Sequence, residues 1–120
     1  MSKSELKDAL DRTSEIELTV KGRKSGQHIS RPVWFVHEND ILYLLPVQGS
    51  DTNWYKNLLK DPTMKISING MQITKNAKPI TDSNKVKDIV DKFRSKYGSS
   101  EVKKYYTKFD VGVELALQQE

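Results

Sequence analysis

Residues 15–36 read EIELTVKGRKSGQHISRPVWFV, two runs of alternating apolar and polar residues separated by a short basic turn. Such alternation is typical of β-strands that bury one face. It predicts a first strand at residues 15–20 and a second at residues 28–36. Pro32 lacks the N–H group that a strand ladder needs, so we expect it at a sheet edge, a bulge or an interruption.

The basic turn, residues 22–27 (GRKSGQ), has the chemistry of an anion site. Its two glycines are expected at positive φ, which lets the backbone turn tightly and a ligand approach closely. Arg23 offers a planar fork of donors, Lys24 a point charge and Ser25 a hydroxyl group. Backbone N–H groups in such a turn can also form an anion-binding nest. The alternative is a hairpin turn whose two cations are simply solvated.

The remaining strands are predicted from the same alternation and from turn residues. Residues 41–47 are apolar on both faces, which predicts a central strand that is covered on both sides. Asn69-Gly70 is the strongest short hairpin signal in the chain, and it joins predicted strands at residues 64–68 and 71–80. A last strand is predicted at residues 109–117.

Amphipathic helices are predicted around these strands. The first ends near Thr13 and begins at a cap on Ser2 or Ser4, the second covers residues 53–60, and the third begins at a cap on Asp82 or Ser83 and ends at Gly98. A further helical turn is expected through Tyr105 and Tyr106. The expected apolar positions are Leu6, Ala9 and Leu10 in the first helix, Trp54, Tyr55, Leu58 and Leu59 in the second, and Val86, Ile89, Val90, Phe93 and Tyr97 in the third.

Six strands with helices outside them predict an α+β fold, a small closed or nearly closed barrel in one domain of residues 1–120. The chain has no cysteine, which excludes disulfides, thiol catalysis and cysteine-ligated metals. His28 and His37 have no matched carboxylate motif, so no metal site is expected. No apolar run resembles a signal peptide or a membrane span, and we expect a cytoplasmic protein.

The net charge is +4, from 20 cations and 16 anions, which suits an anionic small molecule and is too diffuse to demand nucleic acid. The loop at residues 46–50 should lie near the second strand and leads into the aromatic pair Trp54 and Tyr55. Together these features fit a flat ring with a phosphate tail. The alternative is that Trp54 and Tyr55 pack in the core and that Trp34 packs in the barrel or against a second subunit. No hydrolytic triad stands out, so demanding chemistry would belong to a cofactor.

An ordered set of motifs between about residues 15 and 81 resembles the deazaflavin-dependent nitroreductase family. That family belongs to the wider group of flavin-binding, pyridoxamine-phosphate-oxidase-like split-barrel proteins. The motifs are GRKSGQ at residues 22–27, RPVWF at 31–35, QG at 48–49, WYKNL at 54–58 and DP at 61–62. The resemblance implies a six-stranded antiparallel split β-barrel with peripheral helices, commonly a homodimer. It also implies coenzyme F-420 as the cofactor, with FMN as the alternative.

The resemblance also implies roles for particular residues. The phosphate-bearing tail of the cofactor would contact the basic turn, through Arg23, Lys24 and Ser25, with Gly26, Gln27 and Arg31 beside them. The ring would be flanked by Pro32, Val33 and Trp34 and by Val47, Gln48 and Gly49, with support from Trp54, Tyr55 and Asn57.

The implied reaction is hydride transfer to a small electrophilic acceptor such as a quinone, an enone or a nitro compound. No catalytic residue is identified, and Tyr43, Tyr105 and Tyr106 are candidate proton donors. Two alternatives belong to other classes. One is a non-catalytic carrier or sensor for a flavin, deazaflavin or haem-like ligand, and the other is a barrel that binds single-stranded nucleic acid.

Overall fold

The structure is a computed structural model, and it describes residues 8–117 of the chain. Residues 8–11 are helical, whereas Ser2, Ser4 and Leu6 of the predicted first helix lie outside the described residues. The described strands are β1 (Ile16–Lys21), β2 (His28–Val33), β3 (Phe35–Glu38), β4 (Ile41–Leu44), β5 (Thr63–Ile68), β6 (Met71–Asn76), β7 (Lys78–Ile80) and β8 (Gly112–Ala116). Besides residues 8–11, the described helices are the short η1 (Gly49–Asp51), α2 (Asn53–Lys60), α3 (Ser83–Tyr97) and α4 (Ser99–Tyr105).

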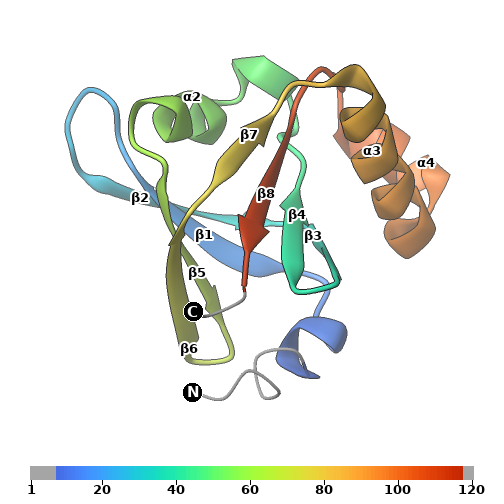
Figure 1. The fold of residues 1–120 in the computed structure, drawn as a ribbon, viewed down its shortest axis with the longest axis horizontal. Helices are drawn as coiled ribbons and strands as arrows, with labels where there is room; N and C mark the ends of the chain where they lie inside the picture. Colours follow the sequence, from blue (N-terminus) through green and yellow to red (C-terminus); the bar gives the residue numbers. More distant parts are fainter. Residues whose placement is uncertain (1–7, 118–120) are drawn as a thin grey trace.

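The strands form two antiparallel four-stranded sheets, in the orders β2-β1-β5-β6 and β3-β4-β8-β7 (Figure 1). The prediction of an α+β fold with antiparallel strands and outer helices is confirmed, but the prediction of one six-stranded barrel is wrong. Two predicted strands are each divided, at Trp34 and at Ala77, because the pairing partner changes there. The register of β1 with β2 ends at the pair Ile16 and Val33, and the register of β3 with β4 begins at Phe35. Each divided run therefore contributes one strand to each sheet.

Local sequence signals explain where strands lie and end. Pro32 stands in β2, which is an edge strand, as its missing N–H requires. The strand β4 lies between β3 and β8, which confirms the predicted central position. It ends at Leu44 and not at residue 47, since Pro46 cannot donate to a ladder. The last strand begins at Gly112, three residues later than predicted.

Tight turns connect neighbouring strands. Asn69 and Gly70 have φ angles of 49° and 81°, which confirms the predicted hairpin between β5 and β6. Asn39 and Asp40 also have positive φ, 52° and 63°, and reverse the chain between β3 and β4. Asparagine and aspartate tolerate this conformation better than other residues with side chains.

Two clusters of buried apolar side chains hold the fold together. The first core cluster lies between the two sheets and includes Leu18, Leu44 and Val113, all with no exposed surface. The second core cluster lies between the outer face of the β3-β4 pair and the helices α3 and α4, and it is centred on Phe93 and Val102. In Figure 1 these two helices stand beside β3 and β4, on the far side of the molecule from β2.

The helices follow the predicted patterns closely. The bounds of α2 are those predicted, but Leu59 was wrongly placed on its apolar side and is 57% exposed. The carboxylate of Asp82 accepts hydrogen bonds from the N–H groups of Asn84 and Lys85 and so caps α3. Gly98 ends α3 with a φ of 95°. None of the helices within residues 8–117 is long and apolar enough to cross a membrane.

Candidate functional site

The basic turn closes through its own backbone. Gly22 N–H donates to Gln27 O at 2.7 Å, and Gly26 N–H donates to Gly22 O at 3.0 Å. Gly26 has a φ of 73°, as predicted, whereas Gly22 lies outside the left-handed region, so the prediction for Gly22 is wrong. A Cβ atom at Gly22 would instead crowd its neighbours, lying 3.2 Å from both Gln27 O and Ile29 Cδ1. A side chain at this position would require its neighbours to shift by a few tenths of an ångström.

The turn is fastened to α2 through Arg23. The buried side chain of Asn57 accepts two hydrogen bonds at Oδ1, from Arg23 N–H at 3.1 Å and from Arg23 Nη1 at 2.7 Å. Arg23 Nη1 also lies 3.4 Å from Asn53 O, and Lys60 Nζ donates to Arg23 O at 2.9 Å. Arg23 is therefore an anchor of the turn as well as a candidate ligand contact.

A pocket of about 270 Å³ lies between the basic turn and α2, and we name it the turn pocket. Three cations and a hydroxyl group line it, and no carboxylate does. Its lining consists of Gly22, Arg23, Lys24, Ser25, Ile29, Arg31, Asn53, Trp54 and Asn57. Six predicted cofactor contacts are thus brought together in one place: Arg23, Lys24, Ser25, Arg31, Trp54 and Asn57.

A second hollow of about 450 Å³ lies on the other side of the turn, where Gly26, Lys60 and Asp61 join residues 22–25. Thr63 N–H donates to Asp61 Oδ1 at 3.1 Å, and hydrogen bonds from Thr63 lower the pKa of this carboxyl group. The hollow thus contains an ionised carboxylate beside its cations, whereas the turn pocket does not. The turn pocket is the better anion site of the two.

Backbone donors around the turn are mostly in use. The N–H groups of Gly22, Arg23, Gly26 and Gln27 all donate to protein acceptors. Within residues 8–117 this leaves the N–H groups of Lys24 and Ser25, together with the side chains of Lys24 and Arg31, for a ligand. The predicted nest is therefore smaller than the length of the turn implies.

The predicted ring-flanking residues of the second strand lie outside the lining of the turn pocket. Pro32 is exposed opposite Glu17, and Val33 is half-buried against the first core cluster. Trp34 stacks on Tyr97 with the ring centroids 4.2 Å apart and the ring planes at 10°. It packs, half-buried, against the outer helices α3 and α4 and not between the two sheets.

The loop that carries Val47, Gln48 and Gly49 is held by the segment before β8. Thr107 N–H donates to Val47 O at 2.9 Å, while Gln48 N–H donates to Thr52 Oγ1 at 2.8 Å. Gly49 has a φ of 56°, and a Cβ atom there would collide with Asp110 Oδ1. The loop therefore depends on a glycine at this position.

Asp110, in the segment before β8, holds this loop, and sequence reasoning missed it. Its carboxylate accepts bonds from the N–H group of Ser50, at 2.9 Å, and from the Ser50 hydroxyl. Desolvation acts to raise the pKa of Asp110, but the bonds from Ser50 and the charge of Lys108 outweigh it and lower the pKa. No local signal could identify this contact, because the two residues lie 60 positions apart.

The remaining candidate residues lie outside the turn pocket or in the core. Tyr55 is 3% exposed and packs in the first core cluster. Tyr43 lies under Lys92, with Nζ 5.6 Å from the ring centroid, and burial raises its pKa. Tyr105 is 47% exposed and Tyr106 is 5% exposed, so one of this pair points away from the core. Burial raises the pKa of Tyr106 far above that of a free phenol. In the described part of the chain no group of three or more histidine, aspartate or glutamate side chains could hold a metal ion.

Comparisons with known proteins agree with this fold. A conserved hypothetical protein from Mycobacterium tuberculosis is 17% identical, with a TM-score of 0.79, over 99% of this chain and 82% of that chain. An F-420-H2 dependent reductase is 18% identical, with a TM-score of 0.66, over 85% of this chain and 93% of that chain. An FAD-binding protein from Mesorhizobium loti is 13% identical, with a TM-score of 0.64, over 99% of this chain and 91% of that chain.

These solved structures share the overall fold of this chain, and an F-420-H2 dependent reductase is among them, as expected from the resemblance to the flavin-binding group. No curated protein matches the chain. A family model described as "Uncharacterized protein conserved in bacteria (DUF2255)" matches residues 5–112. The chain therefore belongs to the DUF2255 family.

Proposed function

We propose that this protein binds a deazaflavin, coenzyme F-420, or alternatively FMN, and serves hydride transfer to a small electrophilic acceptor. The observation that carries the proposal is the turn pocket, which unites Arg23, Lys24 and Arg31 with the Ser25 hydroxyl at the start of α2. Two of the structures with this fold, the F-420-H2 dependent reductase and the FAD-binding protein, are named for such cofactors.

The donor set of the turn pocket fits a phosphate group. Arginine and lysine form charge-assisted hydrogen bonds to phosphate oxygens, and a serine hydroxyl adds a neutral donor. The side chain of Trp54 supplies an apolar wall next to these donors. At about 270 Å³ the pocket suits the phosphate-bearing end of a cofactor, and the ring would extend beyond it.

Each residue has a distinct part in this proposal. Arg23 holds the turn against Asn57, while Lys24 and Arg31 neutralise the bound anion. The bound cofactor supplies the hydride, and the protein binds it, orients it and excludes water. Of the three tyrosine candidates, Tyr105 is the most exposed, and it is the proposed proton donor to the acceptor. Tyr105→Phe with unchanged turnover in a panel of quinones, enones and nitro compounds would remove it from that role.

We further propose that the protein is a homodimer. Val47, Tyr105 and Phe109 expose apolar surface. Tyr105 contacts the half-buried Trp34, Phe109 stacks on Tyr106, and Val47 O accepts a hydrogen bond from Thr107 N–H, between these two tyrosines and Phe109 in the chain. Exposed apolar patches of this kind mark contacts between proteins. Light scattering after size exclusion should give twice the mass of one chain, and Tyr105→Glu should shift the mass toward that of one chain.

Titration with coenzyme F-420 and, separately, with FMN tests cofactor binding through fluorescence. The variant is Lys24→Ala/Arg31→Ala, which spares the anchor Arg23. The matched control is Lys85→Ala/Lys87→Ala, which removes two exposed cations from α3 and changes the net charge equally. We expect the variant to lose at least about tenfold in affinity, and the control to lose much less.

The other outcomes separate the alternative functions. Binding without turnover of any acceptor would make the protein a carrier or sensor. Failure of both cofactors to bind would contradict the proposal. Steeply salt-dependent binding of single-stranded nucleic acid, lost in the same variant, would then favour the nucleic-acid alternative.

A further inference from the structure

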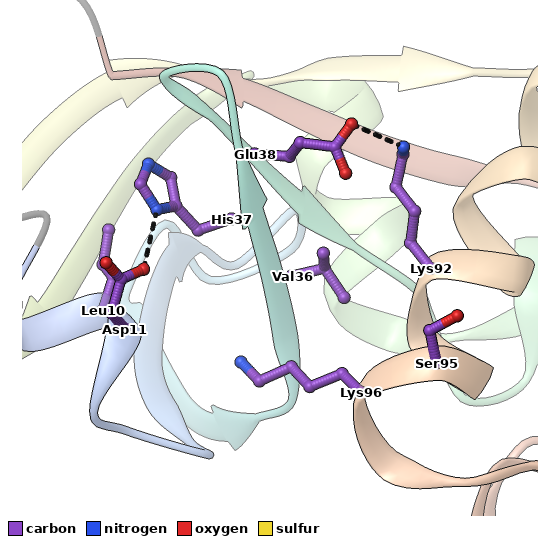
Figure 2. A pocket seen from close by; sticks show the side chains of 8 residues that line it. All are labelled: Leu10, Asp11, Val36, His37, Glu38, Lys92, Ser95 and Lys96. Carbon is purple, nitrogen blue, oxygen red and sulfur yellow. Dashed lines mark hydrogen bonds and ion pairs between the residues drawn. The ribbon is translucent and has the colours of Figure 1, made fainter.

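A separate pocket of about 390 Å³ lies between β3, α3 and the helical residues 8–11, and we name it the Lys96 pocket (Figure 2). Its lining shares no residue with the turn pocket and mixes apolar, acidic and basic side chains. The lining consists of Leu10, Asp11, Val36, His37, Glu38, Lys92, Ser95 and Lys96.

Two lysines one helical turn apart on α3 reach this pocket in opposite environments (Figure 2). Lys92 Nζ donates to Glu38 Oε1 at 2.9 Å, and this bond raises the pKa of Lys92. Lys96 Nζ has no carboxylate within ion-pair distance among residues 8–117. It lies 3.5 Å from the centroid of the Phe35 ring and donates to Phe35 O at 2.8 Å.

The two carboxylates that face Lys96 contact other side chains of the pocket. Asp11 Oδ1 lies 3.6 Å from His37 Nδ1, and Glu38 is bound to Lys92. Burial lowers the pKa of Lys96 to about 8, against the opposing charge of Asp11. A much larger fraction of this amine is therefore neutral near neutral pH than for an ordinary lysine.

The Lys96 side chain as a whole is exposed, but its amine is partly buried at the bond to Phe35 O. In its neutral form a lysine amine is a nucleophile. The bond to Phe35 O uses an N–H group and leaves the nitrogen lone pair available. Leu10 and Val36 give the pocket an apolar floor, and His37 and Ser95 give it polar groups. The volume admits a molecule of several non-hydrogen atoms beside the amine.

We propose that Lys96 captures small aldehydes in this pocket as a reversible imine. The amine nitrogen forms a bond to the carbonyl carbon, and the carbonyl oxygen leaves as water with both protons of the neutral amine. No oxidation or reduction takes place in this step. The site is independent of the basic turn, and it stands whether or not a deazaflavin or flavin binds there.

Reductive trapping tests the proposal on the wild-type protein. Glycolaldehyde is the probe, and cyanoborohydride delivers hydride to the imine carbon and makes the adduct permanent. Peptide mass spectrometry then reports labelling at each lysine over time. We expect Lys96 to be labelled at least about tenfold faster than Lys92, its neighbour in the pocket, and than Lys87, an exposed lysine of the same helix. The rate at Lys96 should saturate with aldehyde concentration.

Two controls keep the test decisive. Lys96→Arg retains the charge and removes the nucleophile, so the fast label should disappear while labelling of the other lysines stays the same. Lys92→Arg retains the ion pair with Glu38 and should leave labelling of Lys96 unchanged. Equal labelling of Lys96 and Lys87, or a rate at Lys96 that does not saturate, would overturn the proposal.

Discussion

The turn pocket and the Lys96 pocket use their cations in opposite ways. At the basic turn, Lys24 and Arg31 are exposed, and the backbone beneath them is held by a buried amide, Asn57. In the Lys96 pocket, the lysine side chain is exposed as a whole, but its amine is partly buried against an aromatic ring. Exposed cations keep their charge and attract anions from a distance, whereas a desolvated amine loses charge and gains nucleophilicity. One basic chain can thus present an anion site and a reactive amine on different elements.

The largest effect should come from Asn57→Ala, which removes the acceptor of both Arg23 bonds. An unpaired Arg23 N–H group and a freed guanidinium should lower the free energy of unfolding by about 2–3 kcal/mol. Urea unfolding measures this loss, and Asn53→Ala, whose exposed side chain makes no such bonds, is the control. Because the basic turn loses its anchor, the affinity for the cofactor should fall, while the rate of aldehyde labelling at Lys96 stays the same. Loss of both cofactor binding and Lys96 labelling would show that the two pockets are not independent.

Tyr97→Phe should have the next largest effect and should act only on the α3 side. The Tyr97 hydroxyl accepts from Phe35 N–H at 3.1 Å and lies 2.7 Å from Ser14 O as a donor. Its loss should reduce the free energy of unfolding by about 1–2 kcal/mol. Ser100→Ala, which removes an exposed hydroxyl of α4, serves as the control. The affinity for coenzyme F-420 should not change. A fall in this affinity together with the loss of stability would show that the two regions are coupled.

Salt should separate the two pockets without any mutation. Raising NaCl from about 0.05 to about 0.5 M should weaken cofactor binding about tenfold, because exposed charges are screened. The labelling rate of Lys96 should change less than about twofold, since that step involves a neutral amine. The two assays in matched buffers give both numbers. A salt-independent cofactor affinity would mean that the phosphate does not lie at the basic turn.

The smallest effect should be a pH-dependent stability that belongs to Lys96. Its folded pKa of about 8 lies below the ordinary 10.5, so between these pH values the unfolded chain holds the proton and the folded chain does not. Stability should therefore rise with pH across this window, by about 1 kcal/mol after allowing for solvent screening of a half-exposed amine. Lys96→Met removes the group, and the difference between the two proteins cancels the tyrosines that ionise nearby. A flat difference curve would contradict the shifted pKa.

Much of the fold could be predicted because its signals are local. Alternation placed the strands, Asn69-Gly70 placed a hairpin, and Asp82 and Gly98 marked the ends of α3. The division of the strands at Trp34 and Ala77 could not be predicted, since it depends on which strands pair on either side. A local pattern gives the number of extended runs, and it does not give the number of sheets that they form.

The candidate site was predictable only in part, for the same reason. The composition of the basic turn indicated an anion site, but the use of Arg23 as an anchor required the docking of α2. The Lys96 pocket was missed, although a signal existed. Ile89, Phe93 and Lys96 follow helical spacing, which places the exposed Lys96 on the same side of α3 as two buried residues.

The most direct test of the proposed function is an amide NMR titration of the protein with coenzyme F-420. We expect the largest chemical-shift changes at the amides of Lys24, Ser25 and Arg31, with little change at His37, Lys92 and Lys96. Largest changes in the Lys96 pocket, or no changes at all, would contradict the assignment of the basic turn as the phosphate site.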